Sequence, residues 1–316
     1  MRKKMVILAI VMGFVFASGS ISSVFAEYPD RPITLLVNFR AGGNIDTLGR
    51  LLAKSMGDTL GQPILAVNKP GGGGGVGAMA LKKSKPDGYT LCFTVATTFV
   101  FNPHFSKKAK YSMDDFRFIA SVTEGQEAFV SLPDRPWKDW KGLIAEARKK
   151  GGLTYSSFTP IERVFMKVVA KKEGVKLIPV PTKGGAGMVP QILGGHVDFA
   201  FSGGIHHSYA KQGKMLVLAS LGDQRLIAFP DVPTLKELGY NVVLDQYVVF
   251  SAPKGVPEEV VQKVNAAAAK AVKDPNVADL IKNKIHWPIA YHGPADITAA
   301  LKKMDASYKQ MKAGLK

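Results

Sequence analysis

Short loops rich in glycine, serine and threonine follow five apolar segments of this chain. They are Phe39-Arg40-Ala41-Gly42-Gly43-Asn44, Ala96-Thr97-Thr98, Ser156-Ser157-Phe158-Thr159, Lys183-Gly184-Gly185 and Ser202-Gly203-Gly204. Small side chains leave backbone N–H groups accessible, and such groups at the start of a helix bind carboxylates or phosphates. One loop of this kind is an ordinary tight turn. Five at equivalent places favour a cleft for a small organic anion, because ligands of open α/β sheets bind beyond the carboxyl ends of the strands.

Arg40 is the cation within the first of these loops. It follows an apolar segment and precedes Ala41-Gly42-Gly43, which places its side chain at the rim of the expected cleft. A guanidinium there can pair bidentately with a carboxylate. The alternative is that Arg40 faces solvent as one more surface charge, and the sequence leaves both open.

Other patterns that carry chemistry are weak in this sequence. The glycine run 71–77 fits the dinucleotide fingerprint G-x-G-x-x-G, but so dense a run fits it almost automatically, and the nearest acid, Asp87, lies in a turn sequence. The serines lack a G-x-S-x-G elbow. The histidines include one adjacent pair, His206-His207, without an H-E-x-x-H or a cysteine pair. We therefore expect no catalytic residues, no cofactor and no metal.

Strands and helices alternate along the chain, which predicts mostly parallel sheets covered by helices. We expect strands at 33–38, 64–68, 89–95, 128–132, 154–157, 177–181, 197–202, 216–220 and 248–251. We expect helices at 47–60, 76–83, 140–149, 161–172, 187–193, 258–272, 278–284 and 296–311. The length suits two domains of ordinary size, so this order predicts two α/β lobes joined by two crossings.

Residues 1–26 have the pattern of a secretory signal peptide. Arg2, Lys3 and Lys4 precede the apolar run 5–17, and small residues lead to Val24-Phe25-Ala26. A basic start, an apolar middle and small residues before the end predict cleavage after Ala26. The apolar run is too short to span a bilayer. We therefore expect an exported, soluble protein of the periplasm.

Charge and cysteine usage narrow the class of partner. Without the signal peptide the net charge falls from +17 to +14, and the remaining basic residues are scattered in pairs rather than gathered in one stripe. This favours an anionic small molecule over nucleic acid. Cys92 is the single cysteine, so no internal disulfide is expected, and its distance from Glu27 argues against a lipid-modified mature N-terminus. We expect a monomer without a lipid anchor.

A series of motifs in a fixed order makes the chain resemble a known family. These motifs are Tyr28-Pro29-Asp30-Arg31-Pro32-Ile33, Val37 to Asp46, Asn68-Lys69-Pro70-Gly71-Gly72, Pro86-Asp87-Gly88-Tyr89-Thr90, Asn102-Pro103, Lys183-Gly184-Gly185-Ala186, Leu193-Gly194-Gly195-His196-Val197-Asp198, Pro230-Asp231-Val232-Pro233-Thr234 and Ala252-Pro253. In this order they are similar to the Bug, or tripartite tricarboxylate transporter (TctC-like), periplasmic substrate-binding proteins. The resemblance covers nearly all of the mature sequence.

The resemblance implies a two-lobed periplasmic binding protein of type II, flytrap-like, with each lobe a mostly parallel α/β sheet flanked by helices. We expect lobe I to comprise 27–127 plus 250–316, and lobe II 128–249. In the family, backbone amides and bridging waters of the first loop hold a carboxylate. Carried over, ligand binding falls on both lobes, at Phe39, Arg40, Ala41, Gly42, Gly43, Asn44, Asp46, Thr97, Thr98, Ser156, Ser157, Phe158, Thr159, Arg163, Lys183, Gly184, Gly185 and Ser202.

Three residues depart from the family pattern. Arg40 stands where a proline is usual, Arg163 where a histidine is common, and Ser202 where an acid often follows the strand. The two arginines favour an anion. Amino-acid binders need an acceptor for the ammonium, since a buried unpaired charge is strongly unfavourable. With Ser202 at the usual acid position and Asp46 beside the anion loop, we expect a carboxylate without an α-amino group.

These observations predict a receptor without catalysis. It would capture a small organic carboxylate in the interlobe cleft and deliver it to the membrane subunits of a tripartite tricarboxylate-type transporter. Two alternatives stay open. The same fold could serve an ABC transporter or a sensor kinase, and, more remotely, an exported enzyme could use the same cleft.

Overall fold

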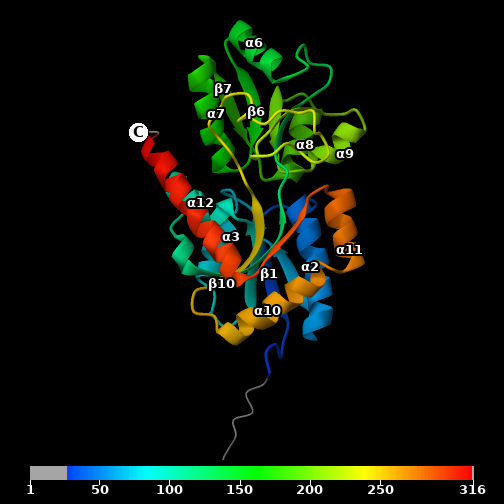
Figure 1. Ribbon diagram of the computed structural model, residues 1–316, viewed down its shortest axis with the longest axis vertical. Coiled ribbons are helices and arrows are strands. Elements are labelled where there is room, and N and C mark those ends of the chain that lie inside the picture. Colours follow the sequence, from blue (N-terminus) through cyan, green and yellow to red (C-terminus); the bar gives the residue numbers. More distant parts are fainter. Residues whose placement is uncertain (1–26, 315–316) are drawn as a thin grey trace, which may run out of the picture.

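The computed structural model describes residues 27–314, which build two sheets stacked along the long axis of the molecule (Figure 1). The predicted signal peptide, 1–26, lies outside the described residues. Among the residues described, no helix combines the length and the apolar character needed to cross a membrane.

The lower sheet in Figure 1 belongs to the lobe in which the described chain begins, and the last helix extends from this lobe to the level of the upper one. Its strands are β1 (Ile33–Val37), β2 (Ile64–Asn68), β3 (Thr90–Val95), β4 (Phe116–Glu124), β10 (Tyr247–Pro253) and β11 (Ile289–His292). Their order is β11-β4-β10-β3-β1-β2. Strand β1 pairs in parallel with β2 and β3, whereas β10 runs antiparallel to β3 and β4. Strands β1 to β4 therefore point the same way, so their carboxyl ends share one edge.

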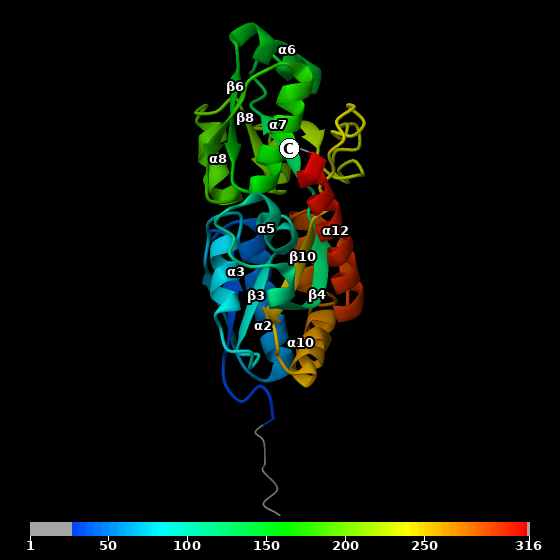
Figure 2. The same cartoon turned by 90° about the vertical axis from the view of Figure 1, so that its left-hand side faces the viewer.

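Helices cover both faces of this sheet (Figure 2). They are α2 (Asn44–Leu60), α3 (Gly75–Lys82), α4 (Thr97–Val100), α5 (Asn102–Phe105), α10 (Glu258–Ala271), α11 (Pro275–Asp279) and α12 (Pro294–Gly314), with a 3₁₀ turn at Met113–Asp115 and a π turn at Leu280–Lys284. Leu48, Leu52 and Met56 form the buried stripe of α2, spaced four residues apart as helix geometry requires. The helix ends at Gly61, whose φ of 74° suits a left-handed glycine cap.

The upper sheet belongs to the second lobe. Its strands are β5 (Ala128–Ser131), β6 (Leu153–Ser157), β7 (Leu177–Pro181), β8 (Phe199–Ser202) and β9 (Leu216–Ser220), in the order β7-β6-β8-β5-β9. Strand β6 is parallel to β7 and β8, and β5 is antiparallel to β8 and β9. The helices of this lobe are α6 (Trp140–Lys150), α7 (Pro160–Glu173), α8 (Gly185–Leu193) and α9 (His206–Lys211).

The chain passes between the lobes twice, once from β4 to β5 and once on the way into β10. The two crossing segments contact each other where the Gly125 N–H donates to the Gln246 carbonyl oxygen at 2.7 Å. The predicted fold class, two mostly parallel sheets flanked by helices, is confirmed. The predicted boundary at residue 250 falls inside strand β10, which begins at Tyr247. The division into lobes at residues 127 and 250 stays a prediction.

Buried apolar residues form three clusters. One covers the face of the lower sheet under α2 and α10, one lies in the upper lobe under α8, and the largest includes residues of both lobes. Phe158, in the loop after β6, packs against all three. This side chain therefore lies where the two lobes meet.

Candidate ligand-binding site

Two hollows lie between the lobes, one on each side of Phe39 and Phe158. The rings of these residues meet edge to face, with centroids 6.4 Å apart. We call the smaller hollow the Trp287 pocket, of about 50 Å³, lined by Phe39, Arg40, Gly43, Asn44, Ile45, Val95, Glu127, Phe158, Thr159, Gly185, Phe201, Gly203, Ile205, Gln246 and Trp287. We call the larger one the lysine cleft, of about 590 Å³, lined by Phe39, Gly71, Gly72, Gly73, Gly74, Phe105, Ser106, Lys107, Lys108, Phe158, Pro160, Arg163, Val164, Lys167, Pro181, Thr182, Lys183 and Gly184.

Asp46 fixes the shape of the loop between β1 and α2. Its Oδ1 accepts hydrogen bonds from Arg50 Nε at 3.0 Å and Asn68 Nδ2 at 2.7 Å. Its Oδ2 accepts from the Gly42 N–H at 3.0 Å. Burial alone would raise the pKa of Asp46, but these hydrogen bonds outweigh it and lower the pKa. Asp46 is thus an ionised anchor of the loop, with its acceptors already engaged.

Glu162 plays the equivalent part in the second lobe. It is fully buried, and its Oε1 accepts from the Ser157 hydroxyl at 3.0 Å and from the Phe158 N–H at 2.7 Å. It also forms a capping box with Thr159 at the start of α7. Burial raises the pKa of Glu162 despite these donors. The hydrogen bonds to Glu162 therefore fix the conformation of the loop that carries Phe158.

The starts of two helices from opposite lobes lie at the Trp287 pocket. Helix α2 begins after Gly43 and helix α8 after Gly184, and glycine has no side chain with which to cap the first N–H groups. Gly43, Asn44 and Gly185 line the pocket. Helix N-termini carry partial positive charge and unpaired donors, so this pair suits an anion.

Buried polar atoms without partners gather in the same pocket. Within residues 27–314, Asn44 Nδ2, Trp287 Nε1 and Glu127 Oε2 are buried and accept or donate no hydrogen bond. All three residues line the Trp287 pocket. A buried polar group left without a partner costs about 1–3 kcal/mol. Two of these atoms are N–H donors, so a bound acceptor such as a carboxylate would remove part of this cost.

Glu127 is the acidic residue among those that line the Trp287 pocket. It lies in the first crossing, between β4 and β5, with 3% of its surface exposed. Burial raises the pKa of Glu127 to about 8, and the charges of Asp245 and Glu124 add to the rise. Burial therefore favours the protonated form of this carboxyl, and among the residues described its Oε2 has no hydrogen-bond partner.

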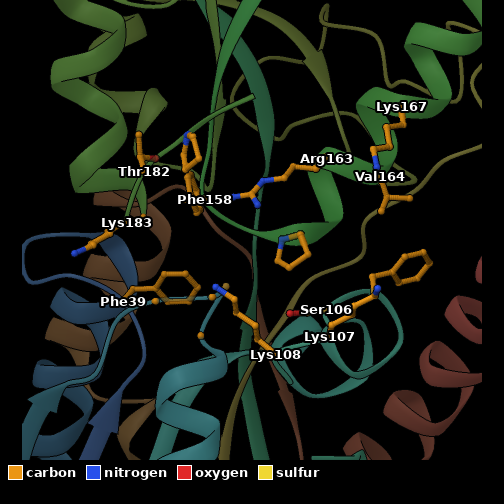
Figure 3. Close-up of a pocket in the computed structure, with 18 residues that line it drawn as sticks. Phe39, Ser106, Lys107, Lys108, Phe158, Arg163, Val164, Lys167, Thr182 and Lys183 are labelled. Carbon is orange, nitrogen blue, oxygen red and sulfur yellow. The ribbon is translucent and has the colours of Figure 1, made fainter. Parts of the chain in front are cut away.

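The lysine cleft is basic. Lys107 and Lys108 enter it from the loop after α5, whereas Arg163 and Lys167 enter from α7 of the other lobe (Figure 3). Arg163 is half-buried, and its Nε donates to the Ser157 hydroxyl at 2.6 Å. None of the residues that line this cleft is acidic. Such a surface attracts anions toward the interlobe space.

Comparison with known proteins decides the family. The profile described as "Tripartite tricarboxylate transporter family receptor" matches residues 48–293. The chain belongs to this family. A relative from Cupriavidus necator, the "UPF0065 protein in gbd 5'region", is 36% identical over 253 residues, which are 79% of this chain and 77% of the relative.

Solved structures of periplasmic binding proteins share the fold. The structure of periplasmic binding protein BugD has a TM-score of 0.83 at 26% identity, and the match covers 90% of this chain and 97% of BugD. MatC from Rhodopseudomonas palustris, solved with bound malate, has a TM-score of 0.82 at 24% identity, with 90% of this chain and 100% of MatC covered. The family match confirms the predicted family, and these structures confirm the predicted fold.

The residues predicted for the site fall into two groups in this family receptor. Those that line the Trp287 pocket or the lysine cleft are Phe39, Arg40, Gly43, Asn44, Phe158, Thr159, Arg163, Lys183, Gly184 and Gly185. Those that lie outside both are Ala41, Gly42, Asp46, Thr97, Thr98, Ser156, Ser157 and Ser202. The second group has structural contacts, as when the Ser202 hydroxyl contacts His206 Nδ1 at 3.0 Å. Ligand contact by any of these residues stays a prediction.

Sequence reasoning missed three polar residues of the Trp287 pocket: Glu127, Gln246 and Trp287. The first two lie in the crossing segments, which are not loops after parallel strands. Trp287 follows the π turn and has no local pattern around it. A search for acids next to the expected crossings would have found Glu127, whereas nothing in the sequence marks Trp287.

Proposed function

We propose that this family receptor binds a small organic carboxylate in the Trp287 pocket, between its lobes. The observation that carries the proposal is the convergence of donors there. Asn44 Nδ2 and Trp287 Nε1 are buried without partners in the described part of the chain, and the starts of α2 and α8 lie at the same pocket. A carboxylate has enough lone pairs to accept from several of these groups at once.

The same proposal extends to location and partner. The signal-peptide pattern of residues 1–26 supports export to the periplasm. Membership of the tripartite tricarboxylate transporter receptor family supports delivery to the membrane subunits of such a transporter. Service to an ABC transporter or a sensor kinase is the second candidate, since the fold alone does not choose the partner.

Binding without catalysis is the role that the pocket's chemistry favours. Its unpartnered groups are an amide, an indole N–H and a carboxyl. Within residues 27–314, no group of three or more histidine, cysteine or acidic residues is arranged to hold a metal ion. BugD, a relative in fold, is a binding protein by description. We therefore propose a receptor rather than an enzyme.

Asn44→Ala tests the site. The amide nitrogen has no partner among residues 27–314, so its removal should leave the melting temperature nearly unchanged. A carboxylate ligand found by thermal-shift screening should bind about 10- to 150-fold more weakly to the variant, since a hydrogen bond to a charged group contributes about 1.5–3 kcal/mol. Titration calorimetry measures the difference. Asn241→Ala, at an exposed position, is the control.

Two results would contradict the proposal. If no mono-, di- or tricarboxylate raised the melting temperature of the wild type, the ligand class would be wrong. A ligand at 100 times its dissociation constant adds about 2.7 kcal/mol of stability, which such a screen detects. If Asn44→Ala and Asn241→Ala both bound like the wild type, the carboxylate would lie elsewhere.

A further inference from the structure

Glu127 is a buried acid that the carboxylate-binding role does not use. Its Oε2 lines the Trp287 pocket without a hydrogen-bond partner in the part of the chain that the structure describes. Asn44 and Trp287 provide donors to the same small space. A pocket for a carboxylate alone would contain donors only, so a buried carboxyl group requires its own explanation.

The groups around Glu127 favour a positive charge. Glu124 on β4 and Asp245 before β10 add negative charge near it. Tyr308 of α12 is close enough to Glu127 for the two groups to influence each other electrostatically, and Arg40 is the cation at the pocket. The aromatic side chains of Phe39, Phe158, Phe201 and Trp287 line the same pocket. Aromatic faces attract cations, as acids do.

We propose that Glu127 determines specificity by accepting a hydrogen bond from a protonated amino group of the ligand. The pocket would then select a small molecule with a carboxylate at the donor side and an ammonium at Glu127. This inference rests on the proposed function and narrows its substrate class. It replaces the expectation of a carboxylate without an amino group, which rested on Ser202 and Asp46 and did not include Glu127.

Asp46 and Ser202 are poor acceptors for such a group. The Asp46 carboxylate already receives three hydrogen bonds within its own loop. The Ser202 hydroxyl is fully buried against His206. Register places Ala128, the first residue of β5, opposite Ser202, so Glu127 comes directly before that position in the crossing segment. The acid of this pocket is thus supplied from the crossing segment.

The competing interpretation is that Glu127 stays protonated and donates to a second carboxylate of the ligand. The two interpretations differ in where a proton goes. Because burial keeps the empty Glu127 mostly neutral, pairing with an ammonium would release a proton to the buffer. Donation to a carboxylate would release none at neutral pH.

Matched ligand pairs separate the inference from the proposed function. The probes are aspartate with succinate, glutamate with glutarate, and alanine with propionate. We expect the amino member of at least one pair to bind at least tenfold more tightly than its deaminated partner. Tighter binding of the deaminated members throughout would overturn the inference and leave the proposed function standing. Absence of binding by every probe and every carboxylate screened would overturn both.

Glu127→Gln tests the residue itself. Glutamine keeps the shape and can donate a hydrogen bond, but it cannot carry the negative charge. We expect the amino-carboxylate that binds wild type to bind the variant at least 30-fold more weakly. Glu259→Gln, which removes a charge from an exposed position of α10 outside both hollows, should change affinity less than threefold. Equal affinity of wild type and Glu127→Gln would favour the protonated acid and overturn the inference.

Proton counting on the unmodified protein makes the test independent of how the variant folds. Calorimetry at pH 7 in two buffers of different ionisation enthalpy gives the number of protons released on binding. We expect a release of most of one proton with the amino-carboxylate, and none with Glu127→Gln. Zero release or proton uptake by the wild type would overturn the inference.

Discussion

The sequence left two interpretations of Arg40, pairing with a ligand carboxylate or facing solvent as a surface charge. The structure places it between the two. The side chain is exposed, yet it lines the Trp287 pocket and its Nη1 lies near Gly187 in α8 of the other lobe. An exposed guanidinium is screened by water, so a bidentate pair there contributes modestly. We therefore expect Arg40 to affect the association rate of an anionic ligand more than the dissociation rate.

Arg40→Ala should therefore lower the association rate of an anionic ligand about three- to tenfold at low salt, with little change in dissociation rate. Arg40→Lys should behave like the wild type, because steering depends on charge and not on the planar fork. Stopped-flow measurements at several ionic strengths check both, with the exposed Lys270→Ala as a control. A faster dissociation in Arg40→Ala would instead indicate direct pairing with the ligand.

The strand–loop–helix units were predictable because their signals are local. Segment 33–38 is apolar, the glycines follow, and the stripe of α2 repeats at helical spacing. Strand β4 was missed although Phe116, Phe118 and Val122 alternate with less apolar neighbours. Strand β11 has four half-buried residues and an irregular register with β4, so no pattern of its own marks it.

The candidate site was predictable to the same extent and for the same reason. Phe39, Phe158 and Gly185 lie in loops that follow strands, where the general rule for α/β sheets places ligands. Glu127 and Gln246 reach the pocket because the crossings bring distant segments together, as the 2.7 Å contact between Gly125 and Gln246 shows. Pairing across sequence separations of this size leaves no periodic trace in the sequence.

Helix α9 introduces a dependence of stability on pH. Burial lowers the pKa of His206 to about 3 and that of His207 to about 4, and His286, whose ring stacks on His207 at 3.3 Å, adds to the second shift. The unfolded chain binds these protons near pH 6.5. The stability they contribute is therefore full above about pH 6.5 and falls as the pH drops toward 4.

We expect the free energy of unfolding to fall by about 1–2 kcal/mol for each of these histidines between pH 7 and pH 5. Urea denaturation at the two pH values measures the loss. His206→Asn removes one titrating group and should show a smaller loss than the wild type, whereas the exposed His196→Asn should match the wild type. Identical pH dependence in all three proteins would count against this origin.

The two lobes touch on both sides of the Trp287 pocket. Phe39 of the lower lobe meets Phe158, and the Trp287 indole packs directly on the Gly204 backbone of the upper lobe. If the pocket of about 50 Å³ between these contacts binds the ligand, we expect the lobes to separate when it is filled or emptied. We therefore expect close approach at these points to accompany binding, and the packing of Trp287 on Gly204 leaves no space for a side chain at residue 204.

Gly204→Ala tests this dependence. A Cβ at Gly204 would lie 2.5 Å from Trp287 Nε1 and 2.8 Å from two further ring atoms, so the lobes or the indole must move apart. Gly204 also has a φ of 98°, where any side chain adds strain within the upper lobe. Gly213→Ala is the matched control, because its φ is 68° and its Cβ would meet nothing within 4 Å.

Both variants should lose some stability through backbone strain, about 1–2 kcal/mol. Only Gly204→Ala should also bind the carboxylate at least tenfold more weakly, because it hinders the approach of the lobes around the ligand. In small-angle scattering, ligand should compact the wild type and Gly213→Ala but not Gly204→Ala. If Gly204→Ala bound and compacted like Gly213→Ala, the contact between Trp287 and Gly204 would be incidental, and closure would depend on the pair Phe39 and Phe158 instead.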